Sequence, residues 1–104
     1  MEVLAIKTIA GEEIIGNNVR VVDNDWVFMK DTVVLRGVQD PKTGDVIAGF
    51  GDWPAVGRIG QEYRIPVSSI VLMPYLIHED LERQYISNVT GMALPPITPK
   101  ILLS

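Results

Sequence analysis

The sequence contains no cysteine and a single histidine, His78. Without cysteine there is no disulfide bond, no thiolate metal site and no cysteine nucleophile. The adjacent acidic pairs, Glu12 with Glu13 and Glu79 with Asp80, diverge in extended or helical backbone, so they do not form an acid–base couple. We therefore expect a protein that is not an enzyme and that has no resident cofactor or metal.

Long apolar runs and an excess of positive charge are also missing. No stretch approaches the roughly 20 consecutive apolar residues that a membrane-spanning helix needs, and the first residues lack the pattern of a signal peptide. These features predict a cytoplasmic protein. The formal net charge is −4, whereas Lys and Arg supply most of the affinity for phosphate backbones. A nucleic-acid role therefore requires a local basic patch.

The sequence does contain many β-branched residues, which alternate with turns made of Gly, Pro, Asn and Asp, as is typical of an all-β domain. The 104 residues are enough for one domain with a thin core. Pro66 has no N–H for a sheet hydrogen bond, so its strand should lie at an edge or carry a bulge. An edge strand this apolar favours pairing with a second copy. The five strands that we predict are residues 3–9, 14–22, 26–38, 45–53 and 62–73.

A helical pattern follows the strands at residues 79–88. Acidic residues come first, Leu81, Tyr85 and Val89 are spaced by four, and Gly91 is a typical stop signal. The proline-rich end of the chain predicts a polyproline-like or disordered arm. We therefore predict three parts: a small β-barrel at residues 1–75, a C-terminal helix packed on it at 76–91, and a tail at 92–104.

Two segments resemble the motifs of the Sm and Sm-like protein family. Gly11, Ile14 and Gly16, followed by Asp23, have the order of glycines and turn aspartate found in the first motif of that family. Residues 22–33 and 63–71 are similar to the two motifs of Hfq, the bacterial member. The C-terminal helix with its Thr-Gly end is similar to short Sm-like proteins of marine phages.

The resemblance implies a mainly β fold, an Sm-like (SH3-type), strongly bent, five-stranded antiparallel barrel with one C-terminal α-helix. It also implies a homo-oligomeric ring of about five to seven subunits, in which the fourth strand of one subunit pairs with the fifth of the next. Such rings bind RNA or single-stranded nucleic acid near a central pore. Carried over by position, the nucleic-acid-binding residues are Asn24, Asp25, Trp26, Tyr63 and Arg64.

Other interpretations of these residues remain open. Asn24 and Asp25 suit a tight turn, and Trp26 suits a barrel wall. Asp25 stands where Hfq has an aromatic residue, and a ring of such carboxylates would instead suit a divalent cation. The acidic balance of the chain also favours a structural or adaptor ring in phage assembly or host interaction, without nucleic-acid binding. A monomeric SH3-like peptide binder is a third possibility.

Overall fold

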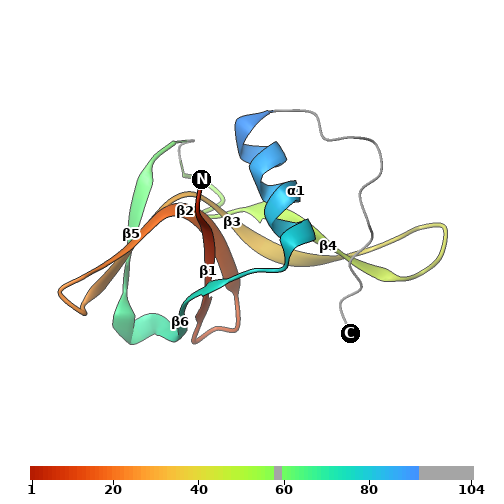
Figure 1. Cartoon of the computed structure of the whole chain (residues 1–104). Coiled ribbons are helices and arrows are strands. Elements are labelled where there is room, and N and C mark those ends of the chain that lie inside the picture. Colours follow the sequence, from red (N-terminus) through yellow and green to blue (C-terminus); the bar gives the residue numbers. More distant parts are fainter. Residues whose placement is uncertain (58–59, 92–104) are drawn as a thin grey trace.

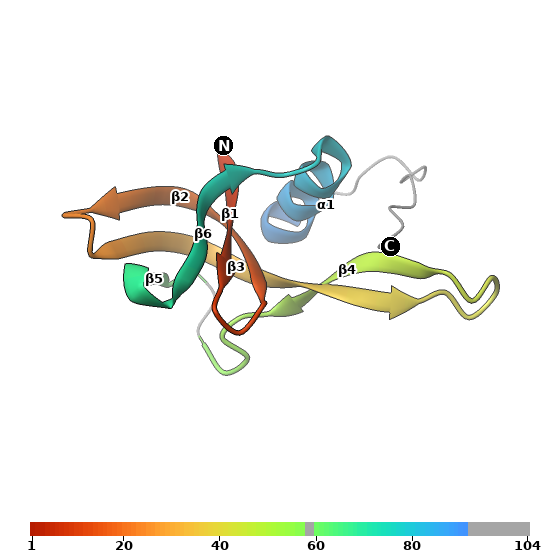
Figure 2. The same ribbon diagram turned by 90° about the horizontal axis from the view of Figure 1, so that it is seen from below.

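The chain folds into six strands and one helix in a computed structural model that describes residues 1–57 and 60–91. Figure 1 shows the helix on one side of a curved sheet, and Figures 1 and 2 both place the β2–β3 and β3–β4 turns at opposite ends of the molecule. The elements are β1 (Val3–Thr8), β2 (Glu13–Val22), β3 (Trp26–Gln39), β4 (Val46–Asp52), β5 (Glu62–Pro66), a 3-10 turn (Val67–Ser69), β6 (Ile70–Leu76) and α1 (Glu79–Thr90).

All strand pairs are antiparallel, and β3 has the most partners, since it pairs with β2, β4 and β5. The order along the sheet is β4-β3-β2-β1-β6, with β5 also paired to β3. The first part of β3 pairs with β5, and its later part pairs with β4. The mainly β class and the single helix predicted from the sequence are confirmed.

The predicted five-stranded closed barrel is wrong, because the sheet stays open between β4 and β6. The segment at residues 62–73, expected as one strand, is two. Pro66 ends β5, and the 3-10 turn after it redirects the chain. As a result β5 pairs with β3 while β6 pairs with β1. Proline lacks the N–H that would continue the ladder, which is the local reason for the break.

The strong bend of the β2–β3 hairpin depends on Gly16. The register of the two strands shifts between Ile15 and Asn17. A Cβ at Gly16 would lie 3.1 Å from the Lys30 carbonyl oxygen and 3.0 Å from Cε of Met29. A residue without a side chain therefore lets the two backbones approach closely at the bend.

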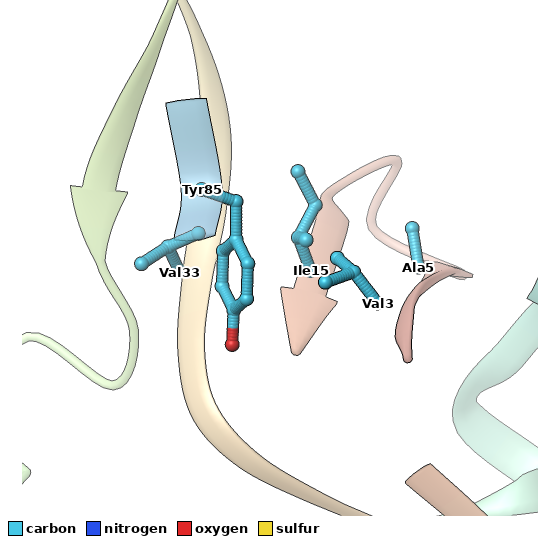
Figure 3. Close-up of a cluster of buried hydrophobic side chains, with 5 residues drawn as sticks. All are labelled: Val3, Ala5, Ile15, Val33 and Tyr85. Atoms are coloured by element: carbon cyan, nitrogen blue, oxygen red, sulfur yellow. The ribbon is translucent and has the colours of Figure 1, made fainter. Parts of the chain in front are cut away.

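Two apolar clusters form the core. The first lies between the sheet and α1, where the ring of Tyr85 packs among four sheet residues (Figure 3). The second fills the curve of the sheet itself. Each fully buried side chain of this size contributes roughly 1.5–3 kcal/mol, so Tyr85 is a main anchor of the helix. The first cluster contains Val3, Ala5, Ile15, Val33 and Tyr85, and the second contains Ile6, Ile14, Val27, Met29 and Ile65.

The hydroxyl of Tyr85 belongs to a group of hydrogen bonds that joins α1 to β2 and β3. It donates to the carbonyl oxygen of Asp31 at 2.8 Å and accepts from Nδ2 of Asn17 at 2.9 Å. Nδ2 of Asn17 also lies 2.9 Å from Oδ2 of Asp31. Burial raises the pKa of Tyr85 to about 12. These hydrogen bonds fix the position of α1 on the sheet, in addition to the apolar contacts that attach it.

The ends of α1 follow the expected signals. Nδ1 of His78 accepts from the backbone N–H of Asp80 at 3.2 Å, and acidic residues occupy the first turn, where the helix dipole favours them. Gly91 closes the helix with a φ of 69°. In the part of the chain that is described, no helix has the length and apolar character needed to cross a membrane. The predicted tail at residues 92–104 lies outside the described residues.

Candidate nucleic-acid interface

The pairing register brings arginine and aromatic side chains together on the outer face of β2, β3 and β5. Arg20, Phe28 and Arg64 form one row across the three strands. Residues opposite each other in antiparallel strands share a face, and successive residues alternate between faces. The next row is Val22, Trp26 and Pro66. We call these six residues the arginine–aromatic face.

This face points away from the core. Val27, Met29 and Ile65 alternate with its residues along β3 and β5, and all three are buried in the second cluster. Arg20 and Arg64 are exposed, and Trp26 and Phe28 are half-buried. A large ligand can therefore reach the arginine–aromatic face without opening the fold.

Each arginine of the face lies over an aromatic ring. The guanidinium carbon of Arg64 is 4.5 Å from the ring centroid of Trp26, and that of Arg20 is 4.3 Å from the centroid of Phe28. Such cation–π contacts are worth about 0.5–1 kcal/mol at exposed sites. The planar guanidinium group is itself a stacking surface for a nucleic-acid base.

One carboxylate lies among these positive charges. Oε1 of Glu62 is 2.8 Å from Arg20, and Glu62 also pairs with Lys30 in the strand register. Exposed ion pairs of this kind contribute at most about 1 kcal/mol. A phosphate can therefore compete with Glu62 for Arg20 at little cost.

Asn24 and Asp25 lie exposed in the turn that precedes Trp26. Asp23 and Asn24 have positive φ values of 55° and 57°, a conformation that Asp and Asn tolerate better than most residues. The carbonyl oxygen of Asp25 accepts from the N–H of Val67 at 2.9 Å, which ties the turn to the segment after β5. The residue types of this turn are thus explained by its backbone, and its side chains are free to contact a ligand beside Trp26.

Tyr63 does not join the other predicted residues, because it precedes Arg64 on β5 and faces the opposite side of the strand. Its ring packs edge-on against Trp53, with the centroids 6.3 Å apart and the planes at 73°. The structure thus brings Trp26 and Arg64 together, places Asn24 and Asp25 next to them at the turn, and separates Tyr63.

Arg20 and Phe28 belong to the face but were not among the residues predicted from the sequence. They could have been found by counting outward from the turn. If Val22 is opposite Trp26, then the next outward pair is Arg20 with Phe28. The necessary signal was the length of the turn, which the cluster of Asp and Asn residues marks only approximately.

The structure offers no obvious metal centre in its described part, because no group of three or more His, Asp or Glu side chains is close enough to hold an ion. Neither the protein-family models nor the curated proteins include a match to this chain.

Proposed function

We propose that the chain is a non-enzymatic, Sm-like protein that binds RNA or single-stranded nucleic acid through the arginine–aromatic face. The observation that carries this proposal is the pair of neighbouring arginine–aromatic contacts, Arg64 on Trp26 and Arg20 on Phe28. Aromatic side chains stack on bases of any sequence, and nearby cations hold the phosphates. This combination is the usual design of surfaces that bind unpaired strands.

The dimensions of the face suit a short stretch of unpaired strand. Trp26 and Phe28 are two residues apart on β3, a separation of about 7 Å along the strand. Each base that stacks on an aromatic or guanidinium group gains about 1–3 kcal/mol. Two neighbouring bases can therefore be held at once, with Asn24 beside them for contacts to base edges.

The local charge is more favourable than the net charge of the chain. Arg20 and Arg64 are exposed on the face, and Lys30 follows Phe28 by two residues on β3, while Glu62 is opposite Lys30 and the exposed Asp23 and Asp25 lie in the neighbouring turn. Lys7, in contrast, lies on β1, opposite Glu13. These three cations are the basic patch that we propose for nucleic-acid binding.

The open sheet supports the ring that we propose for this protein. The described strands leave β4 and β6 at the two ends of the sheet, so β4 of one copy can pair with β6 of the next. Head-to-tail contacts of identical copies close into a ring when the rotation allows it. The resemblance to the Sm-like family gives about five to seven subunits. β6 also exposes an apolar edge that such a contact would cover, namely Val71, Leu72, Met73 and Leu76.

The test is fluorescence anisotropy with short oligo-U, oligo-A and single-stranded DNA at two salt concentrations, on protein whose mass in solution is known. We expect binding at low salt. Arg64→Ala and Arg20→Ala should each weaken binding and reduce the slope of log affinity against log salt by about 1. Arg83→Ala is the matched control, because Arg83 is exposed on α1, away from the face.

Two results would contradict the proposal. One is a folded protein that binds none of the three oligonucleotides at low salt. The other is an equal loss of affinity in Arg83→Ala and Arg64→Ala, which would show that only the total charge matters. A monomeric mass would reject the ring and leave the binding face to be judged by the anisotropy alone.

A structural or adaptor ring without nucleic-acid binding is the second candidate, with a role in phage assembly or host interaction. The apolar edge of β6 favours it, because Leu76 is 76% and Val71 60% exposed. The acidic net charge of −4 favours it as well. A ring mass combined with no oligonucleotide binding would establish this alternative.

A further inference from the structure

A pocket of about 410 Å³ lies on the other side of β5. The pocket is bounded by β3, by the segment that follows β4 and by the end of α1. The residues that give it chemical character are Asp31, Asp52, Trp53, Tyr63 and Asn88. None of these five residues belongs to the arginine–aromatic face.

Two aromatic residues in contact with each other line this pocket. Trp53 and Tyr63 meet edge to face, with ring centroids 6.3 Å apart. The hydroxyl of Thr32 donates to the carbonyl oxygen of Trp53 at 2.5 Å, which holds the Trp53 backbone against β3. Both rings are half-buried, so each still has surface available to a ligand.

The hydroxyl of Tyr63 is buried and has no hydrogen-bond partner in the described part of the chain. Buried polar groups in folded proteins are nearly always hydrogen-bonded. Gly57 lies directly against this hydroxyl, because a Cβ at Gly57 would overlap it. The glycine therefore makes room for a polar group that the protein itself leaves unsatisfied at the pocket.

The charged side chains in the described lining of the pocket are negative. Asp31 and Asp52 line it, and its described lining contains no Lys, Arg or His. Asp31 has a φ of 51°, and its Oδ2 accepts from Asn17 at 2.9 Å, so its carboxylate is held in place. A phosphate would be repelled by these two carboxylates, whereas a cation would be attracted.

We propose that this pocket binds an organic cation, an ammonium or guanidinium group. The cation would lie against Trp53 and Tyr63, as cations do over aromatic rings, and Asp31 and Asp52 would balance its charge. Two sources share this chemistry: a free amine such as a polyamine, and a Lys or Arg side chain of a partner protein. The site is independent of nucleic-acid binding, since β5 separates it from the arginine–aromatic face.

The experiment is a titration of ¹⁵N-labelled protein with tetramethylammonium, observed by NMR. The chain has two tryptophans, whose indole signals are assigned from the spectrum of Trp26→Phe. We expect the Trp53 signal to move and to saturate, while the Trp26 signal stays unchanged. The neutral analogue tert-butanol should produce a smaller shift at the same concentration, because it lacks the charge that the carboxylates and rings attract.

Two charge-matched variants test the role of the carboxylates. Asp52→Asn should weaken tetramethylammonium binding by about fivefold, the effect expected for one nearby charge in a partly solvated site. Asp45→Asn removes the same charge from the exposed β3–β4 turn and should leave the affinity unchanged. Equal effects of the two variants, or equal binding of tert-butanol, would overturn the proposal in favour of a plain apolar cavity. So would a folded protein whose Trp53 signal does not saturate.

The source of the cation is settled by two further ligands in the same assay. Tighter binding of spermidine than of N-acetyl-arginine amide supports a free polyamine. The reverse order supports a side chain of a partner protein. Failure of both to move the Trp53 signal would contradict the proposal even if tetramethylammonium had bound.

Discussion

The buried hydroxyls of Tyr63 and Tyr85 should respond in opposite ways to the same substitution. The hydroxyl of Tyr85 donates to the carbonyl oxygen of Asp31 at 2.8 Å and accepts from Asn17 at 2.9 Å. The hydroxyl of Tyr63 is buried without a partner among the described residues. Replacing either tyrosine by phenylalanine removes one oxygen and keeps the ring, so each variant is the control of the other.

The expected change in the free energy of unfolding depends on which hydrogen-bond partners each substitution leaves unsatisfied. Tyr85→Phe removes a donor from the partly buried carbonyl oxygen of Asp31 and an acceptor from the buried Asn17. Leaving buried polar groups unsatisfied costs about 1–3 kcal/mol, and for a domain of this size each 1 kcal/mol lowers Tm by about 4–8 °C. Tyr63→Phe removes a hydroxyl that is already unsatisfied, so the free energy of unfolding should stay the same or rise slightly.

The measurement is urea unfolding of the wild type and both variants, followed by circular dichroism at one fixed protein concentration, since assembly would shift the apparent stability. An unchanged m value would show that the change lies in stability itself. An equal loss of stability in Tyr63→Phe and Tyr85→Phe would contradict this prediction. Unfolding of Tyr85→Phe at the same urea concentration as the wild type would contradict it as well.

Further predictions concern pH, the bend and the sheet edge. Burial raises the pKa of Tyr75 and of Tyr85 from 10.0 to about 12. Between these values only the unfolded chain loses the two tyrosine protons, so the free energy of unfolding should fall as pH rises from about 10 to 12. Urea unfolding across that pH range should show a smaller fall in Tyr85→Phe. Gly16→Ala places a Cβ 3.1 Å from the facing backbone and should cost about 1–3 kcal/mol in the same assay. Leu76→Lys should reduce the mass of the assembly in light scattering, whereas Val56→Lys, at a position 97% exposed, should not.

The elements of this fold were predictable where the signal is local. The β-branched runs and the Asp-rich turn correctly predicted the β2–β3 hairpin, and the spacing of Leu81 and Tyr85 correctly predicted α1. The prediction was wrong at Pro66, where the segment expected as one strand divides into β5 and β6. Proline indicates an interruption, but it does not say where the chain goes next, and that direction decides whether the sheet closes.

The candidate site shows the same limit. The contact between Trp26 and Arg64 depends on the register between β3 and β5, which are far apart in the sequence, so spacing alone could not establish it. The separation of Tyr63 from Arg64, however, could have been predicted. Successive residues of a strand face opposite sides, so a motif that uses both cannot place them at one surface unless the strand is broken between them.

The alternation along β5 separates the arginine–aromatic face from the pocket. Arg64 faces outward to join Trp26, while Tyr63 faces inward to a pocket that also contains Asp31 and Asp52. A shift of one residue in the pairing of β5 would exchange these two environments. The buried Ile65 opposes such a shift, because it would move from the core to the surface. The same apolar contact that stabilises the sheet therefore keeps Arg64 on the arginine–aromatic face and Tyr63 at the pocket.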